Sequence, residues 1–401
     1  MKLAEKEGMI QMPENDQNKT AREQCVKTHP RASNIELLRI IAMLMIVVYH
    51  IVCHCVNVQL TDKSSMARMH NTLFNHPIFF KKLWILHAIM PFGITGNAIF
   101  LLIAGYFGVE KGNKLNIAKT SKKLLLQQGF AAVTLTIAST VCYRLFWAHR
   151  NVYIGLIGID WFNSMSWFVG YYFLVVLLAR LFLNQFLQRL DRKQYGAFLI
   201  VIFAFTQFGW SGGLADALAS GSRTLATGIF LYSFGGFIKR YQPFKKIKPW
   251  AWILAIGLTY VLIFITDYNS VAQSIEDYIR GGSKGRFIQS MNSYPDFSIV
   301  IMSLSTSVFE LFRRIHIHSS RVINFIGSST FMVYLIHDNG FFYSLWNTKD
   351  WITLLAYHPG RFVLSLAMWT AGTFGVGFTS YLGYLGLAWL CRNRIRSAIQ
   401  R

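Results

Sequence analysis

Long apolar stretches constrain this chain more than any other feature of its sequence. In windows of about 20 residues, the length of helix that crosses a bilayer, about ten candidate spans appear, at 35–57, 84–107, 124–146, 166–188, 195–211, 223–239, 250–267, 296–312, 322–344 and 362–390. Hydrophobic residues make up 53% of the 401 residues and charged residues only 14%. The pattern predicts an all-α fold, a polytopic integral membrane bundle of about ten transmembrane helices.

The distribution of charge indicates how such a bundle sits in the membrane. The formal net charge is +22, but Lys and Arg occur in short blocks between the apolar stretches, and most fall on the same side as the amino-terminal tail. This bias is typical of cytoplasmic loops and of contact with anionic lipid. We therefore expect a multi-pass protein of the cell membrane with both termini in the cytoplasm and no nucleic-acid partner.

The remaining sequence leaves no room for a soluble catalytic domain. We expect a polar cytoplasmic tail at 1–34 without a cleavable signal, a transmembrane domain at 35–391 and a basic cytoplasmic tail at 392–401. The longest loops expected outside, 58–83 and 268–295, are too short for a domain of ordinary size. Any chemistry must therefore be built by the helices and their short loops.

The first span carries two ionisable groups, Arg39 and His50. Such groups are costly inside a membrane and are usually functional. Their separation of eleven residues corresponds to about three helical turns, so both lie on one helix face, roughly 16 Å apart along the axis. For Arg39 the alternative is a side chain that snorkels to the interface, and for His50 it is an interhelical hydrogen bond.

A second polar group follows in the ninth span. His337 lies about 15 residues into that span, as His50 does in the first, and both spans start in the cytoplasm, so the two imidazoles should reach a similar depth. Asp338 follows directly and indicates a polar, water-accessible pocket. The alternative is an ordinary helix end at the outer interface.

No metal site is expected. His50 and His54 have the i, i+4 spacing of a metal pair, but no carboxylate or third ligand accompanies them in the sequence. The five cysteines are scattered and form neither a disulfide framework nor a zinc motif.

Two aromatic residues at span ends are candidate substrate contacts. Trp167 is a candidate platform for stacking a sugar, with an outer aromatic belt as the alternative. Tyr106 lies at the cytoplasmic boundary, where helix packing and an aromatic belt are the alternatives. The sequence has no G-x-S-x-G elbow, phosphate loop or metalloprotease motif. A histidine base is therefore the most economical catalyst.

Four runs in order give the chain a family resemblance. They are IELLR followed by the Arg39-x10-His50 spacing, FLLIAGYF at 100–107, SWFVGYYFLVVLLARLFLN at 166–184, and INFIGSSTFMVYLIHDN at 323–339. With these runs the chain resembles membrane acyltransferase family 3 over nearly the whole of 35–390.

The resemblance implies transfer of an acetyl or other acyl group from acetyl-CoA to a sugar hydroxyl of a bacterial surface or exported polysaccharide. It implies that Arg39 and His50 are essential. It further implies a glycan or lipid-linked sugar acceptor, polysaccharide-assembly machinery as a partner, and no bound cofactor beyond the acyl-CoA donor substrate. The loop after FLLIAGYF carries lysines, and Lys119, Lys122 and Lys123 are candidates to meet phosphate as point charges.

A mechanism combines these expectations. Arg39 anchors the anionic part of the donor, and His50 acts either as general base on the sugar hydroxyl or as a transient acyl carrier. The competing class is a transporter of a lipid-linked sugar or small solute, against which the lack of an internal repeat counts. A sensor or scaffold without turnover is a third alternative.

Overall fold

The computed structural model describes residues 32–60, 82–114, 117–142, 167–208, 216–279 and 297–399. These residues are helical apart from turns and short connections, and no strand occurs among them. The all-α prediction is confirmed for this part of the chain. The expected tail up to residue 31 and most of both long outer loops lie outside the described residues.

The described residues form the following helices, in chain order. They are α2 (Ser33–Ile51), η1 (Val52–Val56), α3 (Asn57–Leu60), α6 (Trp84–Ile89), α7 (Phe92–Gly108), η3 (Val109–Lys114), α8 (Ile117–Cys142), α10 (Trp167–Leu178), η5 (Ala179–Leu183), α11 (Asn184–Arg189), α12 (Arg192–Phe208), α13 (Asp216–Tyr241), α14 (Pro249–Ile279), α16 (Ile299–Arg314), α17 (Arg321–His337), α18 (Gly340–Trp346), α19 (Trp351–Tyr357) and α20 (Pro359–Ile399). Segments η1 and η5 are π-helical, and η3 is a 3-10 helix.

Six of the described helical segments are long and apolar enough to cross a membrane. They are Ser33–Leu60, Trp84–Lys111, Ser121–Cys142, Trp167–Arg189, Pro249–Asn269 and Pro359–Arg394. The other four predicted stretches are occupied by α12, α13, α16 and α17. The count of about ten transmembrane helices therefore stays a prediction, while the membrane character of the bundle is clear.

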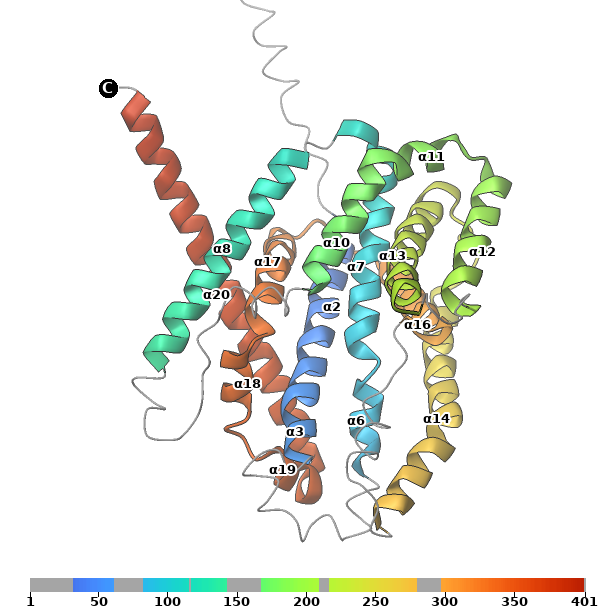
Figure 1. Cartoon of the computed structure of the whole chain (residues 1–401), viewed down its shortest axis with the longest axis vertical. Coiled ribbons are helices and arrows are strands. Elements are labelled where there is room, and N and C mark those ends of the chain that lie inside the picture. Colours follow the sequence, from blue (N-terminus) through green and yellow to red (C-terminus); the bar gives the residue numbers. More distant parts are fainter. Residues whose placement is uncertain are drawn as a thin grey trace, which may run out of the picture.

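Helix α2 lies in the middle of the bundle (Figure 1). It packs against α7 on one side and α17 on the other, and α17 in turn packs against α20. Leu38, Met43 and Val47 of α2 are fully buried. The first span is thus the central element, and its polar residues face other helices.

The outer helices carry apolar side chains on their exposed faces. Ile200 on α12, Ile265 on α14 and Met368 on α20 are between 66 and 70% exposed. Such surfaces would be an aggregation hazard in water, but they match the hydrocarbon core of a bilayer.

Helices α7 and α13 approach each other through reciprocal glycines. A Cβ on Gly105 would lie 1.8 Å from the carbonyl oxygen of Tyr232, and one on Gly235 would lie 2.2 Å from that of Leu102. Small residues let membrane helices pack backbone to backbone. This contact holds α13 against the wall of the cavity described below.

The predicted continuous span at 322–344 is wrong. Helix α17 ends at His337, and α18 begins at Gly340. Asn339 makes the break inside the bundle tolerable, because its amide donates to the carbonyl of Ile336 and its oxygen accepts from the Phe342 N–H at 3.2 Å. One side chain thus satisfies backbone groups at both broken ends. The sequence pattern favoured a continuous span because Gly340 and the aromatic residues after it continue the apolar run, and a helix end after His337 was only the alternative.

The glycine contact gives a stability prediction. Gly105→Ala forces a methyl group into the Tyr232 backbone, so we expect the protein to lose about 1–3 kcal/mol of stability, measured as a lower Tm in mild detergent. Gly129→Ala on α8 is the control, because its Cβ meets nothing within 4 Å. A Gly105→Ala variant as stable as this control would contradict the packing argument.

Candidate functional site

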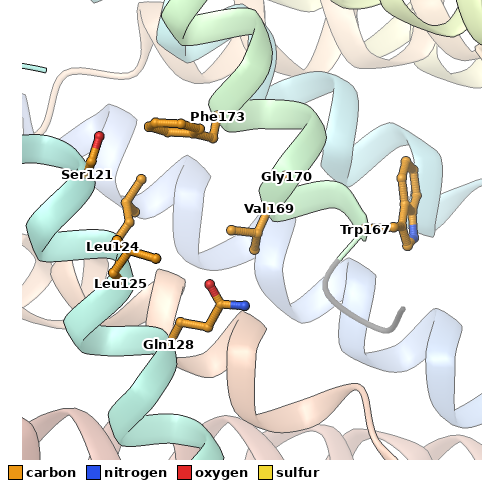
Figure 2. A pocket seen from close by; sticks show the side chains of 8 residues that line it. All are labelled: Ser121, Leu124, Leu125, Gln128, Trp167, Val169, Gly170 and Phe173. Atoms are coloured by element: carbon orange, nitrogen blue, oxygen red, sulfur yellow. The ribbon is translucent and has the colours of Figure 1, made fainter. Parts of the chain in front are cut away.

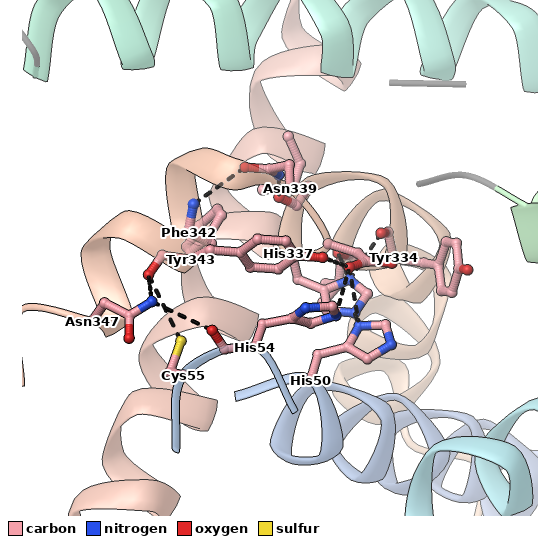
Figure 3. A network of polar contacts seen from close by, with 12 residues as sticks. His50, His54, Cys55, Tyr334, His337, Asn339, Phe342, Tyr343 and Asn347 are labelled. Atoms are coloured by element: carbon pink, nitrogen blue, oxygen red, sulfur yellow. Dashed lines mark hydrogen bonds and ion pairs between the residues drawn. The ribbon is translucent and has the colours of Figure 1, made fainter. Parts of the chain in front are cut away.

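The predicted match in depth between two histidines is confirmed, and the two are in contact. His50 Nδ1 lies 2.9 Å from His337 Nε2, and the rings stack with centroids 4.9 Å apart and planes 7° from parallel. His50 comes from the end of α2 and His337 from the end of α17 (Figure 3). The His337 side chain is fully buried.

Hydrogen bonding assigns the protons of this pair. His337 Nδ1 faces the carbonyl oxygens of Tyr334 at 2.8 Å and Val333 at 3.2 Å, which can only accept, so Nδ1 carries the proton. In the neutral ring, Nε2 of His337 is then an acceptor, and His50 Nδ1 must donate to it. His50 Nε2 is therefore the unprotonated nitrogen, an assignment that rests on the hydrogen-bond network.

Asp338 reinforces this assignment. Its Oδ1 lies 3.4 Å from His50 Nδ1 and accepts a hydrogen bond from the Tyr343 hydroxyl. A carboxylate beside Nδ1 holds an imidazole in one tautomer and favours its charged form when the ring takes up a proton. The helix break puts Asp338 here, because the carboxylate follows the last residue of α17.

His54 extends the cluster through the π-helical turn η1. Its Nε2 lies 4.0 Å from Asp338 Oδ1, and its ring stacks on Tyr343 at 4.1 Å. The Asn347 amide on the segment after α18 donates to the backbone carbonyls of His54 and Tyr343, which ties this turn to α18. π-Helical turns often occur at functional sites. The His54 side chain is 38% exposed, so this end of the cluster is open.

The fold brings a third possible metal ligand to His50 and His54, although the sequence around them offers none. One ligand atom each from His50, His54 and Asp338 lie within 4.8 Å of one another, so the missing carboxylate comes from the connection between α17 and α18. Two imidazoles and a carboxylate are a donor set that zinc uses. Ligation through His50 Nδ1 would require that nitrogen to give up its proton and its contact with His337.

A cavity of about 410 Å³ opens on the other side of this cluster. Among the described side chains, four cations line it, namely Arg39, Lys111, Lys123 and Arg180, and no carboxylate does. Tyr334 also lines the cavity, and its ring lies 5.4 Å from the His337 ring. The cavity therefore extends from the four cations to Tyr334, and the ring of Tyr334 lies between it and the histidine pair.

Arg39 is held at this cavity by its own helix. Its Nη1 lies 2.9 Å from Glu36 Oε1, and the Glu36 side chain is 7% exposed against 30% for Arg39. A Cβ on Gly327 of α17 would lie 2.4 Å from Glu36 Oε2, so only glycine allows α17 this close. The buried carboxylate orients the guanidinium, one turn away, toward the cavity.

Arg180 is a cavity residue that sequence reasoning did not single out. It lies in η5, the second π-helical turn, and is 7% exposed. The available signal was a single arginine inside the apolar run VVLLARLFL.

Of the remaining predicted residues, some line the cavity and others do not. Lys123 lines the cavity, whereas the exposed Lys122 is not among the lining residues. Trp167 is 44% exposed at the start of α10, its ring stacked on Tyr171 at 6.1 Å. Tyr106 lies outside the cavity lining and packs between Phe309 and Lys239. The structure thus brings together Arg39 with Lys123, and His50 with His337 and Asp338.

The chain matches one known family. The model of acyltransferase family 3, described as an acyltransferase domain, matches residues 33–388. The match includes both the cation-lined cavity and the histidine cluster. Neither the curated proteins nor the solved structures give a match.

Proposed function

Since the chain belongs to acyltransferase family 3 and is a membrane acyltransferase, we propose that it transfers an acetyl group from acetyl-CoA to a sugar hydroxyl of a surface or exported polysaccharide. One observation carries the proposal: a cavity with four cations reaches Tyr334, whose ring packs on His337 of the His50–His337 pair. For this reaction the protein must bind an anionic donor and supply a basic nitrogen.

The cavity supports a donor rich in phosphate. The guanidinium groups of Arg39 and Arg180 suit phosphate oxygens in bidentate geometry, and Lys111 and Lys123 add point charges. Arg39 and Lys123 lie near the ends of α2 and α8 that the charge bias assigns to the cytoplasm, where acetyl-CoA is found. The thioester arm then points along the cavity toward Tyr334 and the histidines.

His50 supplies the base. Its Nε2 accepts the proton of the sugar hydroxyl as the hydroxyl oxygen forms an ester bond with the thioester carbonyl carbon. The carbon–sulfur bond breaks, and the CoA thiolate leaves and takes the proton from His50. Asp338 and His337 hold Nδ1 and stabilise the imidazolium between these two transfers.

The same Nε2 can instead carry the acyl group, which makes transfer a two-step reaction. The thiolate leaves first, an acyl-imidazole forms on His50, and the sugar hydroxyl then attacks it. The acceptor reaches His50 from the side of His54, the exposed end of the cluster.

The first prediction about activity concerns His50. His50→Ala removes the base, so we expect transfer to fall by about 10²–10⁴-fold while the protein stays in the membrane. Labelled acetyl transfer by purified protein measures this, together with mass spectrometry of surface glycans from a deletion strain complemented with each form. His318→Ala, at an exposed histidine, is the control. Full glycan acetylation by His50→Ala would refute the assignment.

The second prediction concerns the donor cations. Arg39→Gln and Lys123→Gln should each raise KM for acetyl-CoA, by about tenfold or more for Arg39, because each removes a charge-assisted contact. Lys122→Gln is a matched control, since the neighbouring side chain lies outside the cavity lining. Equal effects of Lys122→Gln and Lys123→Gln would argue against this donor site.

The third prediction separates the two roles of His50. With labelled acetyl-CoA and no acceptor, a carrier releases up to one CoA per protein and retains the label, whereas a general base releases none. We expect no stoichiometric release, because His337 and Asp338 both orient the ring for proton transfer. A burst of CoA that His50→Ala lacks would show the carrier instead.

A further inference from the structure

A second hollow lies between α8 and α10 (Figure 2). It is a groove of about 280 Å³ with mostly hydrocarbon walls, Leu124 and Leu125 on one helix and Val169 and Phe173 on the other. Ser121, Gln128, Trp167 and Gly170 complete it. Leu125 is 67% exposed, so the groove reaches the bundle surface that faces lipid.

The groove adjoins the cation-lined cavity. Leu124, Val169 and Phe173 line both hollows. The ring of Phe168, the residue before Val169, lies 5.8 Å from that of Tyr334, which is adjacent to His337. The two hollows are therefore neighbours, with Leu124, Val169 and Phe173 between them, and Tyr334 on the cavity side lies next to His337.

We infer that this groove is a subsite for the acyl chain of the donor, so that the enzyme accepts acyl groups longer than acetyl. The inference rests on the proposed function, because the chain is placed by a thioester whose CoA phosphates occupy the basic cavity. The reaction is unchanged: a longer acyl group leaves the CoA sulfur and is joined to the sugar oxygen.

The chemistry of the walls supports this occupant. Hydrocarbon in the groove and cations in the adjoining cavity match the two parts of a fatty acyl-CoA, whose chain is apolar and whose other end is anionic. A saturated chain forms no hydrogen bonds. The leucine, valine and phenylalanine side chains of the walls form none either. Each methylene that moves out of water favours binding.

Gly170 provides a way to close the groove. A Cβ added there meets nothing within 4 Å, so a larger side chain enters open space in the groove. Gly129 of α8 has equally open surroundings but is not among the residues that line the groove. The two glycines form a matched pair for substitution within helices.

The experiment measures kcat/KM for acyl-CoA donors of two to ten carbons with one acceptor glycan. For the wild-type protein we expect a rise of roughly fourfold for each methylene that the groove buries. In Gly170→Phe the ratio of the eight-carbon to the two-carbon donor should fall at least tenfold. Gly129→Phe should keep the wild-type ratio. Ser121→Phe, from the opposite wall, should repeat the Gly170→Phe result and makes the test independent of how one variant folds.

The outcomes separate the two proposals. Acetyl transfer with a wild-type chain-length ratio in both Gly170→Phe and Ser121→Phe overturns the acyl subsite and leaves the proposed function standing; the groove then holds only bilayer lipid. A wild-type protein that uses acetyl-CoA and rejects longer donors does the same. Absence of transfer from every acyl-CoA overturns the proposed function and this subsite with it.

Discussion

The contact between His50 and His337 depends on a helix that ends inside the bundle. In an apolar environment every polar group needs a partner, and at the end of α17 the His337 ring donates to carbonyls of its own helix. Its other nitrogen is thereby left to accept from His50. The same ending brings Asp338 to the pair, and Asn339 satisfies the backbone groups that the break exposes. The first helix and a helix almost 300 residues later are joined at this point.

Helix α2 carries two chemical environments along its length. Near its start, Glu36 orients Arg39 at a cavity lined by cations. At its end, His50 lies among an imidazole, a carboxylate and a tyrosine hydroxyl. A rigid helix keeps the two about 16 Å apart. An anionic group can therefore be held at one position while a neutral imidazole acts at another, and both substrates can reach the same protein from different ends.

Much of this could be predicted from the sequence, and the omissions have physical causes. Helices occur at all ten predicted stretches, because a bilayer leaves the backbone few alternatives, and Arg39, His50 and His337 stand out as costly groups in apolar runs. Lys122 and Lys123 could not be separated, since neighbouring residues differ by about 100° around a helix and only packing decides which faces the cavity. The roles of Asp338 and Arg180 depend on an irregular helix ending and a π-helical turn, which leave no periodic signal.

The sequence by itself determined that the chain is an all-α membrane protein. It further determined which ionisable residues lie inside apolar spans, where their energetic cost indicates a function. It also determined that His50 and His337 lie at one depth, because depth follows from counting residues along helices of known rise. Only the tertiary structure decided that the two imidazoles touch, that Asp338 reaches both His50 and His54, and that four cations from four segments share one cavity. Contacts between distant segments depend on helix rotation and close packing, as at Gly105 and Gly327, and these come from the whole bundle rather than from any one stretch.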